Sequence, residues 1–152
     1  ETQAILRYID MTFPNPALQP TESRALARMN QIVGINDWYL FPQAARIIVF
    51  QRIVGPVLMG IAPDEAAVTA ALPDAERCFN ELDRLLGDQA FFAGDRLSIA
   101  DLMVSPQLSY LSAIPECAGM MRGMRLQAWL SRMEARASML ATLPPEALCR
   151  AA

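Results

Sequence analysis

The segment from Ile99 to about Ala113 constrains the fold of this chain more than any other. It has the length of a helix and is apolar on almost every side, so other helices must surround it and it belongs at the centre of a bundle. Ser98 and Asp101 precede and open it at the spacing of a capping box, in which each side chain accepts a hydrogen bond from the other residue's amide. We therefore interpret Ser98 and Asp101 as structural residues.

Other segments of the chain repeat apolar residues at the helical period, and none shows the alternation of a β-strand. These segments cover residues 1–11, 21–53, 63–86 and 126–134 approximately. Thr21 is the predicted N-cap of the long second segment, Pro42 is expected to kink it, and Gly55-Pro56 and Gly60 are expected to break it. The expected fold class is all-α, a helical bundle with a kinked long helix and a capped central helix.

A proline-rich stretch after the first helix predicts a domain boundary. We expect residues 1–13 to be the last helix of an upstream domain, residues 14–20 a linker, and residues 21–152 the helical domain. The chain begins without an initiator methionine and already reads as helix, so we expect it to be part of a longer protein.

Composition excludes several classes of function. A net charge of −3 argues against a nucleic-acid partner, because Lys and Arg supply most of that affinity. The chain has no histidine, and its cysteines, Cys78, Cys117 and Cys149, lie far apart, so no metal site or disulfide framework is expected. Cys78 and Cys117 are predicted core residues. No apolar stretch approaches the ~20 residues that cross a bilayer, and a soluble, cytoplasmic protein is expected.

Three sequence motifs resemble those of the glutathione transferase family. Phe92-Ala93-Gly94-Asp95 followed by Leu97-Ser98-Ile99-Ala100-Asp101 is similar to the family's turn and capped central helix. Glu1-Thr2-Gln3-Ala4-Ile5 is similar to the start of the last helix of its thioredoxin-like domain, with Thr2 in place of Ser. Trp129-Leu130 and Met133 resemble its C-terminal segment, although Ala137 stands where Pro is common. The resemblance implies the family's C-terminal helical domain, preceded by the last helix of the thioredoxin-like domain.

The resemblance also implies binding residues. Glu1 and Thr2 correspond to a pair that binds the γ-glutamyl end of glutathione, and Asp37 to an acidic residue that reaches the same ammonium across a dimer interface. The alternatives are a plain N-cap for Thr2 and a solvated or capping acid for Asp37. Trp38, Phe41 and Ala45 lie near one face at helical spacing and are candidates for the apolar substrate pocket; the alternative is core or dimer packing.

The implied function is that of a glutathione transferase, in which the thiolate of glutathione attacks an apolar electrophile or serves in a reduction. Glutathione would be a co-substrate, no metal is expected, and the protein would be a homodimer with a role in detoxification. The thiol-activating residue would lie in the upstream domain, so no catalytic residue is expected in this chain, and these residues alone should be inactive. A non-catalytic interaction or ligand-binding module of the same fold is the main alternative, and an unrelated bundle that binds apolar ligands is another.

Overall fold

The computed structural model describes residues 1–144. Within that range the secondary structure is helical and contains no β-strand, which confirms the all-α prediction. The segments named η are π-helical, with hydrogen bonds between residues five apart. The helices are α1 (Thr2–Thr12), α2 (Ser23–Ile35), η1 (Asn36–Ala45), α3 (Arg46–Val49), η2 (Phe50–Met59), α4 (Glu65–Leu86), α5 (Ile99–Ser112), α6 (Pro115–Met121), α7 (Arg125–Glu134) and α8 (Ala137–Ala141).

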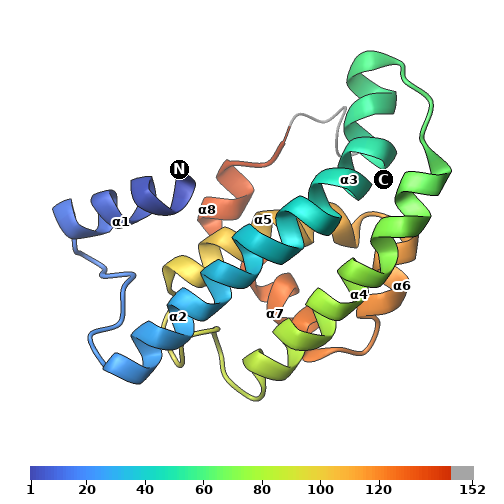
Figure 1. Ribbon diagram of the computed structural model, residues 1–152. Coiled ribbons are helices and arrows are strands. Elements are labelled where there is room, and N and C mark those ends of the chain that lie inside the picture. The colour runs from blue at the N-terminus through green and yellow to red at the C-terminus, as the bar shows by residue number, and fades with distance from the viewer. Residues whose placement is uncertain (145–152) are drawn as a thin grey trace.

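The predicted long helix is formed by α2, η1, α3 and η2, which follow one another without a break from Ser23 to Met59. Figure 1 shows η2 turned away from the line of α2 and α3. Pro42 lies inside η1 and Pro56 inside η2, so the predicted break at Gly55-Pro56 is wrong, whereas the predicted break at Gly60 is confirmed. A π turn accommodates a residue that lacks an N–H group and crowds the preceding turn. The helix ends at Gly60, whose φ of 65° is favourable for glycine.

The first turns of α2 and α4 are capped by acidic side chains. The Glu22 carboxylate accepts hydrogen bonds from the amides of Arg24 (2.9 Å) and Ala25 (2.8 Å), and these bonds lower its pKa. The predicted cap at Thr21 is therefore wrong by one residue, because the two carboxylate oxygens of Glu22 satisfy two orphan amides. The Asp64 carboxylate caps α4 through one hydrogen bond, from the amide of Ala67 (3.0 Å), and the helix starts slightly later than predicted.

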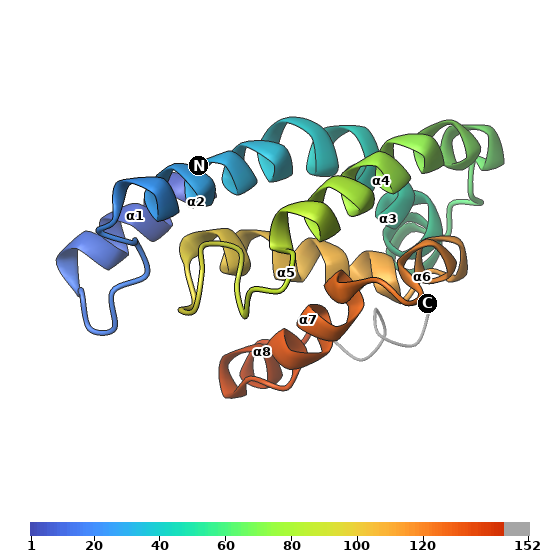
Figure 2. The same cartoon turned by 90° about the horizontal axis from the view of Figure 1, so that it is seen from below.

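Helix α5 lies at the centre of the bundle, as predicted. It packs against α2 and η1 on one side and against α6 and α7 on the other, while α4 packs along η1 and α3. Figure 2 shows α5 between the layer of α2 and α4 and the layer of α7 and α8. Trp129 of α7 is fully buried against Phe92, with ring centroids 4.8 Å apart.

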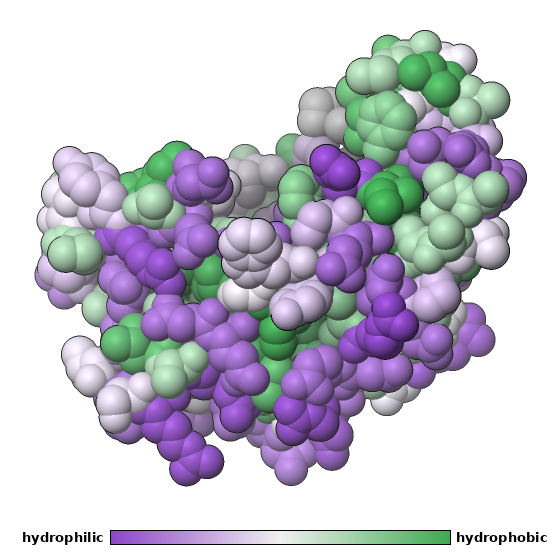
Figure 3. Space-filling model, in the orientation of Figure 1, coloured by the Kyte–Doolittle hydropathy of each residue, from purple (hydrophilic) through white to green (hydrophobic). Residues whose placement is uncertain are grey.

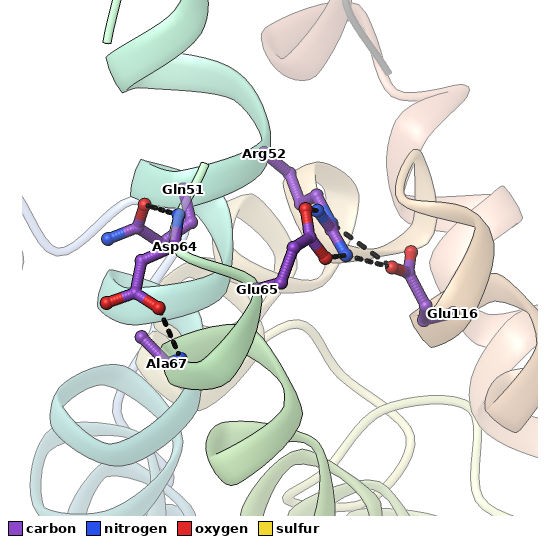
Figure 4. Close-up of polar contacts among 6 residues, drawn as sticks. All are labelled: Gln51, Arg52, Asp64, Glu65, Ala67 and Glu116. Carbon is purple, nitrogen blue, oxygen red and sulfur yellow. Dashed lines mark hydrogen bonds and ion pairs between the residues drawn. The ribbon is translucent and has the colours of Figure 1, made fainter. Parts of the chain in front are cut away.

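An arginine ties the end of the long helix to two other helices. Arg52 of η2 forms ion pairs of 2.6 Å with Glu65 of α4 and with Glu116 of α6 (Figure 4). Hydrogen bonds from Arg52 lower the pKa of Glu65. Helix α6 was not predicted from the sequence, although Pro115 in its first turn is a typical start signal.

Among the exposed apolar side chains of residues 1–144, some gather around α1 and others at the projecting end of η2. Figure 3 shows green surface over both regions. The most exposed of these residues are Ile5, Tyr8, Met11, Phe13, Leu58 and Met59.

Candidate functional site

A polar groove of about 460 Å³ lies between α1 and α2. It reaches the first turn of α1, since Gln3 forms part of its wall, while Glu1 and Thr2 beside it are exposed. Its lining residues are Gln3, Arg7, Gln19, Leu26, Asn30, Val33, Gly34, Asp37 and Trp38. Charged and amide groups dominate this lining, so the groove suits a polar ligand.

Helix α1 is fastened beside the groove by side-chain hydrogen bonds. Arg7 donates to Gln3 Oε1 (3.0 Å) and to Asn30 Oδ1, which joins α1 to α2. Asp10 is buried and accepts from the amides of Leu18 (2.6 Å) and Gln19 (3.2 Å) in the linker. The carbonyl of Leu18 in turn accepts from the amide of Ile99 (3.2 Å), at the start of α5. The sequence analysis missed these roles, because the partners are too far apart along the chain to form a pattern.

Asp37 is the acidic side chain in the groove lining. It is half-buried, it accepts a hydrogen bond of 2.9 Å from Asn36 Nδ2, and it forms no ion pair with residues 1–144. A carboxylate without a cationic partner can receive a ligand ammonium. Glu1 is the N-cap residue of α1, so the alternative of Thr2 as a plain N-cap is wrong; Thr2 is the first helical residue.

The single face predicted for Trp38, Phe41 and Ala45 is not formed. Trp38 is 73% exposed and Phe41 is 42% exposed, whereas Ala45 is buried at 1%. The prediction assumed α-helical spacing, but these residues belong to η1, where each π turn holds about one more residue and shifts later positions around the axis. Trp38 borders the polar groove, while Ala45 belongs to the core.

A second, largely apolar cavity of about 600 Å³ lies between α5, α8 and η2. Ile53, Pro106, Tyr110 and Met139 contribute to its walls, as does Leu143. The Ser109 hydroxyl at its edge donates to Glu134 Oε1 (2.8 Å). A mainly apolar space with few polar groups is the usual form of a small-molecule site. Sequence reasoning missed it, because its walls come from segments far apart in the chain.

Ser98 and Asp101 form the predicted capping box at the start of α5. Asp101 is fully buried, and its Oδ2 accepts from the Ser98 amide (2.9 Å) and hydroxyl (2.7 Å). Its Oδ1 accepts from the Phe92 amide (3.0 Å) and from Trp129 Nε1 (3.1 Å). Burial raises the pKa of the Asp101 carboxyl, against the effect of these hydrogen bonds. Asp101 thus joins the turn, α5 and α7, a wider structural role than capping.

The cysteines and the acidic residues offer no further reactive site in the described part of the chain. Cys78 and Cys117 are buried, as predicted, and burial raises their pKa to about 11 and about 12. Cys149 lies outside the described residues. Within residues 1–144 no cluster of potential metal ligands occurs, and none of the helices there combines the length and the hydropathy needed to span a membrane.

The family described as "Glutathione S-transferase, C-terminal domain" matches residues 65–132. Glutathione S-transferase hmp2 of Hypomyces subiculosus is 27% identical over 139 residues, which cover 90% of this chain and 65% of that protein. Glutathione S-transferase theta-2B of Homo sapiens is 30% identical over 142 residues, which cover 89% of this chain and 55% of that protein. This chain therefore spans less than two thirds of the length of either relative.

A solved structure of glutathione S-transferase III in its apo form agrees with the fold. It superposes with a TM-score of 0.82 at 28% identity, over 95% of this chain and 69% of that one. The similarity thus covers nearly the whole chain.

Proposed function

Because the chain contains the C-terminal helical domain of the glutathione S-transferase family, we propose that it holds glutathione and an apolar second substrate for transfer of the thiol. The observation that carries this proposal is the groove between α1 and α2, where Asp37 lies in the same lining as the first turn of α1. The separate apolar cavity would hold the apolar second substrate of this reaction.

The proposed domain organisation assigns residues 1–13 to the last helix of a thioredoxin-like domain, 14–20 to a linker and 21–152 to the helical domain. The exposed apolar surface of α1 supports this assignment, since Ile5, Tyr8 and Ile9 recur at helical spacing and are all exposed. Such a stripe is normally covered by another part of a protein.

Glutathione would lie with its γ-glutamyl end at the start of α1. The first amides of a helix have no partners within the helix, so with the Thr2 hydroxyl they suit the γ-glutamyl carboxylate. Glu1 and Asp37 suit the ammonium of the same group. In the proposed homodimer, Asp37 would bind the ammonium of glutathione held either by its own protomer or by the partner.

In the transfer step the thiolate sulfur attacks an electrophilic carbon and forms a C–S bond, while the leaving group departs with the electrons of the broken bond. A free thiol has a pKa of ~8.5, so the reaction needs a group that stabilises the thiolate. The chain has no histidine, and its described cysteines are buried, so we assign this group to the upstream domain. The electrophile would occupy the apolar cavity, and Trp38 borders the groove.

Calorimetric titration of the complete protein with glutathione and with S-hexylglutathione tests the proposal. Gly34 lines the groove, and a Cβ atom there would meet no atom within 4 Å, so Gly34→Leu places an apolar side chain in the groove. We expect this variant to weaken binding of both ligands at least about tenfold. Gly119→Leu is the matched control, because Gly119 is also helical and open but lies in α6.

The outcomes separate the candidate functions. Failure of the unmodified protein to bind either ligand would refute the proposal. Binding without turnover of an aryl halide would favour the non-catalytic module. An intact mass of the natural protein well above 16.8 kDa would provide room for the upstream domain.

A further inference from the structure

A buried asparagine stands next to the acidic residue of the groove. Asn36 is 2% exposed and lies at the junction of α2 and η1. Its backbone N–H group donates to the carbonyls of both Ile32 and Val33. At this junction the Asn36 side chain is enclosed by protein, while its neighbour Asp37 lines the groove.

The contact between the two side chains has a defined direction. Asn36 Nδ2 donates to Asp37 Oδ1 at 2.9 Å. The opposite orientation of the amide would bring its oxygen against a carboxylate oxygen, and two acceptors repel each other. Asn36 Oδ1 is buried and has no hydrogen-bond partner within residues 1–144. A buried acceptor without a partner destabilises the fold. The favourable polar contact of this side chain is its hydrogen bond to Asp37.

We propose that Asn36 is a positioning residue, which orients the Asp37 carboxylate for the ammonium of the γ-glutamyl group. This inference rests on the proposed function, because it assigns the ammonium to Asp37. The bond to Oδ1 fixes the plane of the carboxylate and leaves Oδ2 for the ligand. A fixed acceptor loses less conformational entropy on binding than a rotating one.

Asn36→Leu tests the inference with two ligands, glutathione and its analogue without the α-amino group. Leucine has a similar size, removes the donor and also removes the unpaired acceptor. Loss of one hydrogen bond to a charged group predicts about a fivefold or larger loss of affinity for glutathione. The affinity for the deamino analogue should change less than about twofold, because that ligand does not use Asp37.

Asn30→Leu is the matched control. The substitution is the same, and Asn30 lies in α2 and lines the same groove, but it bonds to Arg7 rather than to Asp37. It should change the affinities for both ligands by the same factor. In an Asp37→Asn background, Asn36→Leu should have no further effect on glutathione affinity.

An equal change for both ligands in Asn36→Leu would overturn the inference, because a purely structural role affects both alike. No change for either ligand would overturn it as well. If the unmodified protein does not bind glutathione, the proposed function fails first. If Asn36→Leu does not fold, Asn36→Asp gives the same comparison, since it replaces the donor by a carboxyl group that repels Asp37.

Discussion

Removal of the Asp101 carboxylate should destabilise the bundle far more than loss of an ordinary helix cap. In Asp101→Ala, four donors lose their acceptor. The Ser98 hydroxyl can rotate toward another acceptor, but three buried donors cannot: the amides of Phe92 and Ser98 and the indole nitrogen of Trp129. Each buried unsatisfied donor costs about 1–3 kcal/mol, so the gross cost is about 3–9 kcal/mol. Release of the buried carboxylate offsets part of this cost, and we expect a net loss of about 4 kcal/mol.

Two further variants grade the effect. Asp101→Asn keeps one acceptor oxygen but turns an NH₂ group toward other donors, and it should cost about 2 kcal/mol. Ser98→Ala removes the hydroxyl of the capping box and leaves the Asp101 carboxylate in place, so it should cost about 1 kcal/mol. The order of stability should therefore be Ser98→Ala, then Asp101→Asn, then Asp101→Ala.

Urea unfolding followed by tryptophan fluorescence measures these differences. The chain has two tryptophans, of which Trp38 is exposed and Trp129 is buried. In a Trp38→Phe background the signal therefore reports Trp129 alone. With a slope of about 2 kcal/mol/M, Asp101→Ala should lower the urea midpoint by about 2 M. If it lowers the midpoint no more than Ser98→Ala does, Asp101 is only a cap, and the reasoning from three orphaned donors is wrong.

Three other predictions follow from contacts described above. Asp10→Ala should release the amides of residues 18–19, so limited proteolysis should cleave the linker faster while α4 stays intact; unchanged cleavage would contradict this. Arg52→Gln should lower the melting temperature by less than about 4 °C at low salt, and 1 M NaCl should remove most of the difference, because the ion pairs are partly exposed. In a Cys149→Ser background, Cys78 and Cys117 should not react with a thiol reagent at pH 8, because burial raises the pKa of both thiols and disfavours the thiolate. Labelling of either cysteine should require unfolding, and rapid labelling of the native protein would refute this prediction.

The features predicted from sequence are those with a short-range signature. The central position of α5 followed from its apolar composition, and the bond between Ser98 and Asp101 followed from their spacing. The same reasoning failed in η1, because residue types do not reveal where one extra residue enters a helical turn. For that reason Ala45 was grouped with Trp38, although the structure buries it in the core.

The candidate site was harder to predict than the fold. Asp37 was found through a resemblance, and the structure adds its position in a groove. Asn36, the donor to Asp37, looks like any polar residue of a long helix until its burial is known. The apolar cavity has no local signature, since residues such as Ile53 and Met139 meet only after the chain has folded.

One residue between α1 and α2, Leu18, bonds to two parts of the molecule. The N–H group of Leu18 is bound by Asp10 of α1, and its C=O group is bound by the amide of Ile99 in α5. Displacement of α1 therefore disturbs the first turn of the central helix, and fraying of that turn loosens α1. Energetic coupling of this kind is reciprocal, so a change that stabilises α1 stabilises the first turn of α5 by the same coupling free energy, and the reverse also holds. A ligand that orders α1 would thus also stabilise the first turn of α5.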